Sequence, residues 1–546
     1  MKKGKSARRY SRSRWFVSSR PARLGHRHRC DAPQLAFEQL EPRMFLDAAL
    51  PTLAWAATAK ASLNDAPGAA VAGLDAALTS AITTKGHIKP PPGGGYHTYD
   101  TLLSDLRNIA ATHPNIAQLI DISTYTTSTS TATLLTKGGR HLWAMKISDN
   151  AIVAEAGEPE LAYIGSMHGN EPVGMEMCYD FIKELTDKYG TDSSVTSLVN
   201  GNEIWVLPLM NPDGLQANKR ENGWNQDLNR SFPHLEADST QSTNQLGPAF
   251  TDADLQGLNK GRTPEAAAVM RWSRAENIVL AANFHTGNLV VNYPYDSMAG
   301  VPSGQPAISP DDALFRYIST EYASHNAPMF ASTQFPGGIT NGNQWYQVIG
   351  GMQDWSYRYL GTNEVTVELS SVYKPPASQL PTLWNNNRDS MMAYLETIDT
   401  GIRGLVTDSG GHPLRATVTV VDMSSGTPVA NAHKVFTSQD FGDYYRMLLP
   451  GSYNIAFSCP GYAAQTINGV SVSLDMATLV NVTLPAALGG RSVVNVGNSP
   501  PQNQNVALAA AALRGQSVWA PAAKAGLDQP EKATDAFLAA LAEQRA

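Results

Sequence analysis

Four short apolar runs between residues 160 and 370 each end in polar side chains of an unusual kind. Residues 161–164 precede His168, residues 204–210 precede Asn211, residues 278–284 precede His285, and residues 365–367 precede Glu368. Before the runs, the apolar spacing at residues 99–113 predicts a helix, and further helical segments lie between them at residues 172–189 and 263–276. Strands that alternate with helices are typical of an α/β fold, in which ligands bind beyond the carboxyl ends of the strands. We therefore expect a largely buried sheet with a site at these polar residues.

The pattern changes on both sides of this α/β segment, which we place at residues 96–400. Residues 401–486 contain short alternating segments at 416–421, 452–458 and 478–484, with turn residues at 408–411 and 450–451. This pattern predicts a small antiparallel β-sandwich. Residues 48–95 end in Pro-Pro-Pro-Gly-Gly-Gly and read as a linker, whereas residues 487–546 form a low-complexity, Ala-rich tail.

Composition and charge narrow the classes of function. The 546 residues have a net charge of -7, but residues 1–29 carry eleven Lys or Arg and no acidic residue, so the remaining 517 are at -18. An acidic body disfavours nucleic-acid binding and suits cationic partners. No apolar run approaches the length of about 18 residues that a transmembrane helix needs, so we expect none. The three cysteines, Cys30, Cys178 and Cys459, form neither a disulfide framework nor a metal-binding pattern.

One short motif has the spacing of a metal site. In His168-Gly169-Asn170-Glu171 an imidazole and a carboxylate lie three residues apart, so one helical turn or tight loop brings both to the same face. Two such ligands plus a distant His make the open zinc site of hydrolases, with water in the fourth position. The motif alone is more often two unconnected surface residues, so its weight depends on the segments around it.

Those segments resemble a known family as an ordered set. They are His168-Gly169-Asn170-Glu171-Pro172, Asn211-Pro212-Asp213-Gly214, Asp227-Leu228-Asn229-Arg230-Ser231-Phe232-Pro233, Phe284-His285-Thr286-Gly287 and Val367-Glu368-Leu369-Ser370. Together they resemble the zinc carboxypeptidases of the M14 family, most closely the branch of carboxypeptidases D, E and N. The resemblance implies a mixed central sheet flanked by helices, followed by a transthyretin-like β-sandwich at residues 401–486.

The resemblance also implies roles for individual residues. His168, Glu171 and His285 would bind one Zn²⁺ per chain, and Glu368 would be the general base that takes a proton from the zinc-bound water. Asn229 and Arg230 would clamp the C-terminal carboxylate of the substrate, and Arg220 would polarise the scissile carbonyl. Tyr346 would cover the bound substrate. The alternatives are a solvated strand-end carboxylate for Glu368, a surface ion pair for each Arg and a buried core aromatic for Tyr346.

Two further residues bear on specificity. Asp296 and Gln353 match positions that accept basic side chains in the D, E and N branch. A carboxylate at the base of a pocket favours a cationic side chain, because a buried carboxylate is costly without a partner. The alternative is that Asp296 and Asp354, the residue after Gln353, are structural and cap a helix or turn.

The leading hypothesis is a zinc metallocarboxypeptidase that removes C-terminal Lys or Arg from peptides or proteins. A second hypothesis keeps the same centre but assigns a cell-wall peptide as substrate, and a third is an inactive, surface-anchored binding protein. The sandwich would support folding or contact other proteins. Residues 39–46 resemble a Leu-Glu-Pro-Arg sorting signal within a basic leader, residues 1–47, which predicts export to an extracellular, cell-surface or periplasmic location. A disordered basic tail is the alternative for this leader.

Overall fold

The computed structural model describes residues 95–127, 130–234, 262–421, 433–474, 476–487 and 494–495. All of them lie in the unit Ile82–Ala546, which we describe here by itself. The predicted leader lies outside the described residues, as do nearly all of the predicted linker and most of the predicted tail.

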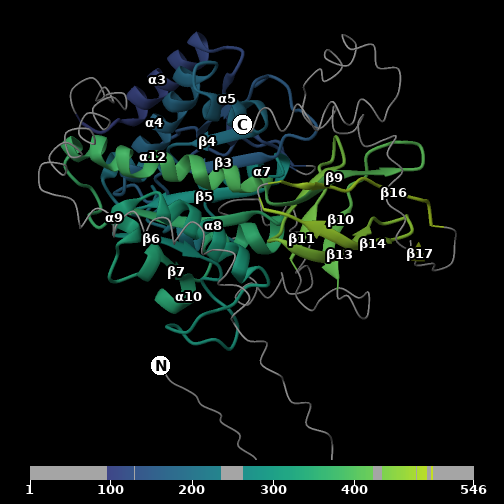
Figure 1. Cartoon of the computed structure of the whole chain (residues 1–546). Coiled ribbons are helices and arrows are strands. Elements are labelled where there is room, and N and C mark those ends of the chain that lie inside the picture. Colours follow the sequence, from purple (N-terminus) through teal and green to yellow (C-terminus); the bar gives the residue numbers. More distant parts are fainter. Residues whose placement is uncertain are drawn as a thin grey trace, which may run out of the picture. The chain divides into compact units, whose positions relative to one another are not determined.

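An eight-stranded mixed sheet forms the centre of the first domain (Figure 1). Its order is β1-β2-β4-β3-β5-β8-β6-β7, and the four central strands β4, β3, β5 and β8 run parallel. The strands are β1 (Ala117–Asp121), β2 (Trp143–Ile147), β3 (Glu160–Ile164), β4 (Glu203–Leu207), β5 (Leu280–His285), β6 (Asn288–Tyr293), β7 (Ile339–Asn341) and β8 (Asn363–Ser370). The predicted apolar runs all fall on central strands, although the run at 204–210 continues three residues past the end of β4.

Helices cover both faces of this sheet. They are α3 (Tyr99–Thr112), α4 (Val173–Lys188), α5 (Ser193–Asn200), α6 (Pro212–Ala217), α7 (Pro264–Ala275), α8 (Asp312–Ser324), α9 (Ala327–Phe330), α10 (Gly342–Trp345), α11 (Met352–Trp355) and α12 (Leu380–Glu396). The three helices predicted from periodicity are confirmed as α3, α4 and α7. Among the described helices, none is both long and apolar enough to cross a membrane.

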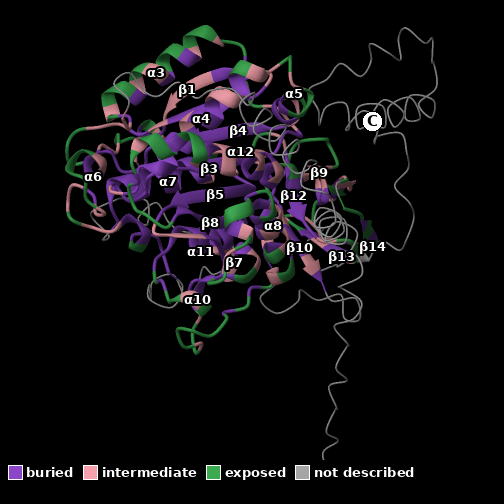
Figure 2. Cartoon of the chain, turned by 60° about the vertical axis from the view of Figure 1, so that its left-hand side comes forward, coloured by how far each residue is buried: buried purple, intermediate pink, exposed green. Residues whose placement is uncertain are grey.

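The buried strands divide their side chains between two cores, one on each face of the sheet. On β3, Tyr163 joins the core formed with α4, α8 and α12, whereas Ala162 and Ile164 join the core formed with α7. Alternate side chains of a strand point to opposite faces, so a strand covered on both sides is apolar at nearly every position. Figure 2 shows the result as a continuous band of buried residues through the sheet. This double coverage is why the strands appeared in the sequence as unbroken apolar runs.

A β-domain follows, with nine strands among its described residues. One sheet has the order β11-β10-β13-β14-β17, and the other has the order β12-β9-β15, with β16 also paired to β9. The strands are β9 (Gly401–Asp408), β10 (Thr417–Val421), β11 (Lys434–Phe436), β12 (Asp443–Met447), β13 (Gly451–Ser458), β14 (Gln465–Val472), β15 (Thr478–Leu479), β16 (Val482–Leu484) and β17 (Val494–Asn495). A separate apolar core lies between them. The short strand β17, paired with β14, falls within the segment predicted as tail.

The predicted strand at 478–484 is two strands, β15 and β16, and the sequence pattern missed the break. Both pair with β9, but the Asn481 side-chain oxygen accepts a hydrogen bond from Leu405 N between them. The carbonyl of Val480 packs against Gly404, where a Cβ would lie only 2.2 Å from that oxygen. An irregular ladder at this point interrupts the strand without changing its alternation of apolar and polar residues.

One buried charged cluster joins the α/β domain to the sandwich. Asp311, directly before α8, lies 2.7 Å from Arg446 and 2.8 Å from His433, both of the sandwich. Tyr357 OH donates a hydrogen bond of 2.9 Å to the same carboxylate. Burial alone would raise the pKa of Asp311, but Arg446 and His433 hold that pKa well below its ordinary range. Arg446 is only 3% exposed, so Asp311 compensates a guanidinium that is out of reach of water.

We expect Asp311→Asn to lower the free energy of unfolding by about 3–5 kcal/mol, because it leaves the buried Arg446 charge without its partner. Urea denaturation at pH 7 measures this loss. The control is Asp312→Asn, whose partner Arg316 is largely exposed, and it should cost less than about 1 kcal/mol. Since the pKa of Asp311 is depressed in the folded state, its stabilisation is present above about pH 4 and is lost as the pH falls further. An equal, small effect of both substitutions would contradict this account.

Candidate active site

The loop after β3 carries the first two candidate ligands. It contains Ser166 in a left-handed conformation (φ 47°) and leads into α4. Asn211 holds this loop in place, because its side-chain nitrogen donates to Met167 O at 3.2 Å while its oxygen caps α6 at Gly214 N. Gly169 packs against α6 so closely that a Cβ would lie 2.0 Å from the carbonyl carbon of Gly214. The Asn211 hydrogen bonds and the close Gly169 contact therefore fix the loop without any ligand.

His168, Glu171 and His285 come together as a buried cluster. Each offers one ligand atom, and these atoms all lie within 4.8 Å of one another. The Nδ1 atoms of His168 and His285 are 2.9 Å apart, and each lies near a different oxygen of Glu171, at 3.0 Å and 3.2 Å. The three side chains are 1–2% exposed. The structure thus brings together all three residues that the sequence predicted as ligands.

The protonation states of the three groups depend on one another. Burial alone would raise the pKa of Glu171, but hydrogen bonds from His168 and His285 hold it well below its ordinary range. Burial lowers the pKa of His285, and the charge of His168 lowers it further. Burial also opposes the charged form of His168, yet Asp227 and Glu171 outweigh it and raise its pKa. One carboxylate and two imidazoles facing a single point form the donor set of an open zinc site, and these residues fit that metal.

Glu368 lies beside this cluster on β8. The register of the parallel pair β5·β8 places it opposite His285. Its side chain is 8% exposed, and its Oε2 atom is buried without a hydrogen-bond partner among the described residues. Burial and the charge of Glu171 raise the pKa of Glu368 to about 8. Groups with such shifted values serve as general acids and bases near neutral pH.

Arg220 reaches the same cluster from the loop after α6. Its Nε donates to Asp227 Oδ2 at 3.0 Å, and its Nη1 lies 3.1 Å from His168 Nδ1 and 3.3 Å from Glu171 Oε1. The rival Lys219 is exposed and makes no such contact in the described structure. Arg220 is therefore the basic residue that faces the candidate metal ligands.

The predicted carboxylate clamp, Asn229 and Arg230, lies in the short 3₁₀ helix η3 (Leu228–Arg230). Asn229 is buried, and its side-chain oxygen accepts a hydrogen bond of 3.0 Å from Met352 N, so its amide group is held by the backbone of α11. Arg230 is exposed and donates to the neighbouring carbonyl Asn229 O at 2.8 Å. Tyr346 is 41% exposed, so it is not the core aromatic of the alternative interpretation. Its pKa is raised to about 12, first by burial and then by the charges of Glu368 and Asp296.

Asp296 and Gln353 form a polar floor near this clamp. Gln353 Nε2 donates to Asp296 Oδ1 at 2.8 Å, and Asn292 Nδ2 donates to the same oxygen at 3.2 Å. Burial and the charge of Asp354 raise the pKa of Asp296 well above its ordinary value. Two glycines pack against this carboxylate. A Cβ at Gly342 would lie 2.0 Å from Asp296 Oδ1, and one at Gly351 would lie 2.9 Å from Oδ2. The backbone can pack this closely against the carboxylate because those two positions carry no side chain.

Asp354, which the sequence left open, has a structural role. Its two oxygens accept hydrogen bonds from Asp296 N at 2.8 Å and Ser297 N at 3.2 Å, so it fixes the backbone that carries Asp296. The structural alternative thus holds for Asp354, whereas the side chain of Asp296 accepts from Asn292 and Gln353 and caps none of the described helices or turns.

Sequence reasoning missed the residue that orients His168. Asp227 Oδ1 lies 3.1 Å from His168 Nε2, and its second oxygen holds Arg220. Such carboxylate–histidine pairs fix the tautomer and the ring orientation of a metal ligand. The available signal was the position of Asp227 at the head of the Asp227-Leu228-Asn229-Arg230 segment.

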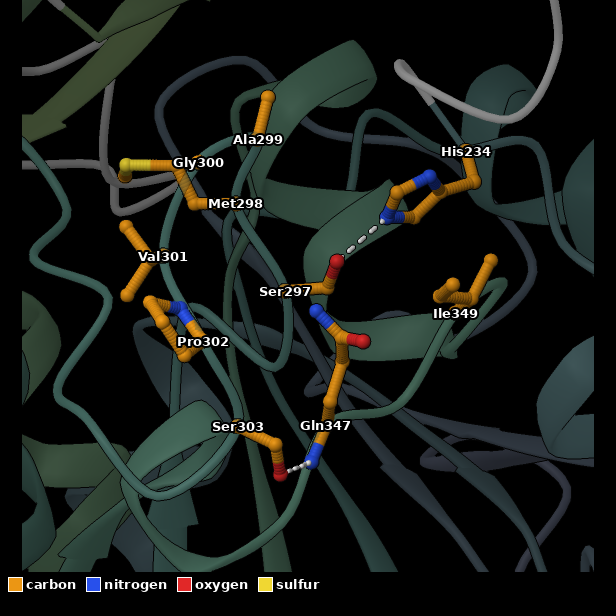
Figure 3. A pocket seen from close by; sticks show the side chains of 10 residues that line it. All are labelled: His234, Ser297, Met298, Ala299, Gly300, Val301, Pro302, Ser303, Gln347 and Ile349. Atoms are coloured by element: carbon orange, nitrogen blue, oxygen red, sulfur yellow. Dashed lines mark hydrogen bonds between the residues drawn. The ribbon is translucent and has the colours of Figure 1, made fainter.

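A surface cavity of about 650 Å³ lies next to the polar floor (Figure 3). Its walls come from the loop 297–303, which starts directly after Asp296, and from His234, Gln347 and Ile349. None of its lining residues is a candidate metal ligand. Figure 3 shows His234 and Ser297 joined by a hydrogen bond of 3.1 Å across one side of it. The cavity is thus a neighbour of the candidate site and not the site itself.

Comparisons with known proteins agree with this arrangement. A model of the zinc carboxypeptidase family matches residues 102–390, and a model of the carboxypeptidase regulatory-like domain matches residues 401–485. Carboxypeptidase D of Mus musculus is 37% identical over 442 residues, which cover 74% of this chain and 29% of that protein. The carboxypeptidase N catalytic chain of Homo sapiens is 33% identical over 415 residues, which cover 72% and 86%. The chain belongs to the zinc carboxypeptidase family, although it spans less than a third of the length of carboxypeptidase D.

We expect Asp227→Asn to weaken zinc binding about 10- to 100-fold, because the amide removes the carboxylate that orients His168. Competition with a chromogenic chelator measures the affinity. Asn229→Ala is the control, since Asn229 makes no contact with the candidate ligands in the described structure, and its zinc affinity should stay within about twofold of wild type. Equal affinities of wild type and Asp227→Asn would contradict the role given to Asp227.

Proposed function

We propose that this protein is a zinc-dependent metallocarboxypeptidase that hydrolyses the C-terminal peptide bond of peptides or proteins and prefers C-terminal Lys or Arg. The observation that carries the proposal is the convergence of His168, Glu171 and His285 within 4.8 Å, with Glu368 opposite His285 on the adjacent strand. Membership of the zinc carboxypeptidase family supports this activity, and the proposal assigns it to the residues of this chain.

One Zn²⁺ per chain would be held by His168, Glu171 and His285, the two-His, one-Glu set that occurs in carboxypeptidase A. When bound, zinc polarises the scissile carbonyl and makes water a stronger nucleophile at neutral pH. The buried, low-pKa Glu171 supplies the negative charge for the cation, and Thr286 N holds its second oxygen at 3.0 Å. Asp227 keeps His168 turned with Nδ1 inward.

Glu368 takes a proton from the attacking water and delivers it to the leaving amine. Its buried position and its unpartnered oxygen suit a group that exchanges a proton in each half of the reaction. Arg220 stays anchored to Asp227 through Nε, so its terminal nitrogens can turn to the carbonyl oxygen where negative charge develops.

Recognition of the C-terminal residue is assigned to Asn229, Arg230, Tyr346, Asp296 and Gln353. Arg230 and the amide nitrogen of Asn229 bind the terminal carboxylate, since planar donors suit a two-oxygen anion. Tyr346 covers the substrate. Asp296, held by Gln353, accepts a basic side chain. Among the described residues this buried carboxylate has hydrogen-bond donors but no ion-pair partner, and a cation would relieve the cost of burying it.

We also propose that the protein is exported, on the support of the Leu-Glu-Pro-Arg-type segment in residues 1–47. The sandwich is proposed to support folding or to contact other proteins. Support for the folding role is the buried Asp311–Arg446 pair that joins it to the α/β domain.

Glu368→Gln should lower kcat/KM about 10²- to 10⁴-fold, because the amide cannot accept the proton of the attacking water. Hydrolysis of a peptide that ends in Arg measures the rate, and metal analysis should still find one zinc per chain. Glu364→Gln is the matched control on the same strand, where Glu364 is buried and bound to Asn283 away from the centre. It should keep its activity within a few-fold of wild type. A Glu368→Gln enzyme with undiminished activity would rule out the proposed base.

Asp296→Asn should reduce the preference for Arg over Phe by about 30-fold or more, since truncating one partner of a buried charge pair costs about 2 kcal/mol or more. The measurement is kcat/KM for four peptides that differ only in a C-terminal Arg, Lys, Phe or Glu. The rate for the Phe peptide should change little, which separates lost specificity from misfolding. A wild-type preference for Phe or Glu would refute the proposed specificity while leaving the peptidase activity in place.

A further inference from the structure

A second cluster of carboxylates lies outside the candidate active site. Asp149, Glu155 and Glu158 are in the loop 148–159 between β2 and β3. Each offers one oxygen, and these oxygens all lie within 4.8 Å of one another. No step of the proposed peptidase reaction uses them. The cluster therefore needs a separate explanation.

Burial distinguishes this cluster from an ordinary acidic surface. Glu158 is 1% exposed, and both of its carboxylate oxygens are buried without a hydrogen-bond partner among the described residues. Asp149 and Glu155 are only partly exposed. A buried carboxylate that has neither a hydrogen bond nor a counter-charge is strongly disfavoured. An unpartnered, buried carboxylate aimed at two others indicates that a positive ligand is missing from its surroundings.

The neighbouring charged groups do not supply that ligand. Lys146 is directed to Glu203, with its Nζ 2.9 Å from Glu203 Oε2, and it also donates to Val153 O at 3.0 Å. The other oxygen of Glu203 accepts a hydrogen bond from Glu155 N at 2.9 Å. One lysine therefore faces four carboxylates and is bound to the one outside the cluster. Burial, followed by the charges of Asp149, Glu155 and Glu203, raises the pKa of Glu158 to about 9.

We propose that Asp149, Glu155 and Glu158 bind a calcium-like divalent cation at a site separate from the candidate zinc centre. The donors are all carboxylate oxygens, which hard cations prefer to the nitrogen and sulfur ligands that zinc favours. Three carboxylates on one irregular loop suit Ca²⁺, which accepts flexible geometry and six to eight oxygens. Mg²⁺ demands near-ideal octahedral geometry and keeps its waters.

The position of the site predicts a structural effect. Gly157, next to Glu158, donates its backbone N–H to Asp443 Oδ2 of β12 at 3.0 Å. The loop thus contacts the sandwich directly, through a glycine with a φ of 90°. A cation that neutralises the cluster holds this loop in the conformation that makes the contact. Calcium should therefore stabilise the fold and leave the chemistry of the peptidase centre unchanged.

The rival explanation is that the carboxylates share protons and bind nothing. A neutral Glu158 would then be mimicked by Gln, so Glu158→Gln would be as stable as wild type and calcium would have no effect on either. A cation site makes the opposite prediction. These two outcomes are distinguished by stability and binding alone, independent of any hydrolysis, so a failure here does not bear on the proposed peptidase activity.

The test uses the full chain, freed of metals on a chelating resin and reloaded with one equivalent of zinc. Calorimetric titration of this protein with CaCl₂ at pH 7.5 should show one calcium site, and saturating calcium should raise the Tm by about 3 °C or more. MgCl₂ at the same concentration should raise it less. Glu158→Gln and Asp149→Asn should lose at least tenfold in calcium affinity and most of the Tm shift. Asp187→Asn, which removes an exposed carboxylate on α4, should respond to calcium as wild type does.

Terbium provides a second readout, because Tb³⁺ replaces Ca²⁺ at oxygen sites and emits when a nearby tryptophan is excited. The ring of Trp205 lies 5.7 Å from Lys146 Nζ, beside the cluster. Wild type should show tryptophan-sensitised emission that calcium displaces and that Glu158→Gln lacks. The proposal is overturned if calcium neither binds nor shifts the wild-type Tm, or if both Glu158→Gln and Asp149→Asn retain the full response.

Discussion

The parallel pairing of β3, β5 and β8 is the constraint on which the rest of the site depends. His285 ends β5, Glu368 lies opposite it on β8, and the loop that follows β3 carries His168 and Glu171. A shift of one residue in either ladder would turn Glu368 or His285 to the other face of the sheet, because strand side chains alternate. Two apolar cores, one on each face, hold the register, since a shift would place side chains of the wrong size and shape in each closely packed core.

The two buried carboxyl groups at the end of these strands, Glu171 and Glu368, have pKa values shifted in opposite directions. Glu171 is kept ionised by two imidazoles, whereas Glu368, a short distance away, has its pKa raised to about 8. Environments that separate the pKa values of two carboxyl groups assign one as ligand and the other as acid or base. Asp227 couples the two halves of the site, because one oxygen orients His168 and the other anchors Arg220.

Much of the fold and of the candidate site could be predicted from the sequence, and for physical reasons. Doubly covered strands must be continuously apolar, so β3, β4, β5 and β8 were recognisable, and amphipathic spacing marked α3, α4 and α7. The metal ligands were found because the family-like segments keep their order along the chain. The break between β15 and β16 was missed, because the Asn481 contact that interrupts the ladder leaves the apolar pattern intact.

The residues that escaped prediction act through contacts between distant segments. Asp227 contacts His168 from 59 positions away along the chain. Gly342 and Gly351 matter because a Cβ at either position would collide with the Asp296 carboxylate. The carboxylates of Asp149, Glu155 and Glu158 lie close together in sequence, but nothing in their spacing indicates that Glu158 is buried without a partner. Burial and partner identity are properties of the folded chain, so a single sequence carries no direct signal for them.

The most direct test of the central claim is mass spectrometry of a peptide that ends in Arg, incubated with the wild-type protein before and after zinc is removed by a chelator. The account predicts that the zinc-loaded protein shortens the peptide by its single C-terminal arginine, that the chelated protein leaves it intact, and that added zinc restores the cleavage. An intact peptide with the zinc-loaded protein, internal cleavage, or cleavage that survives the removal of zinc would contradict it.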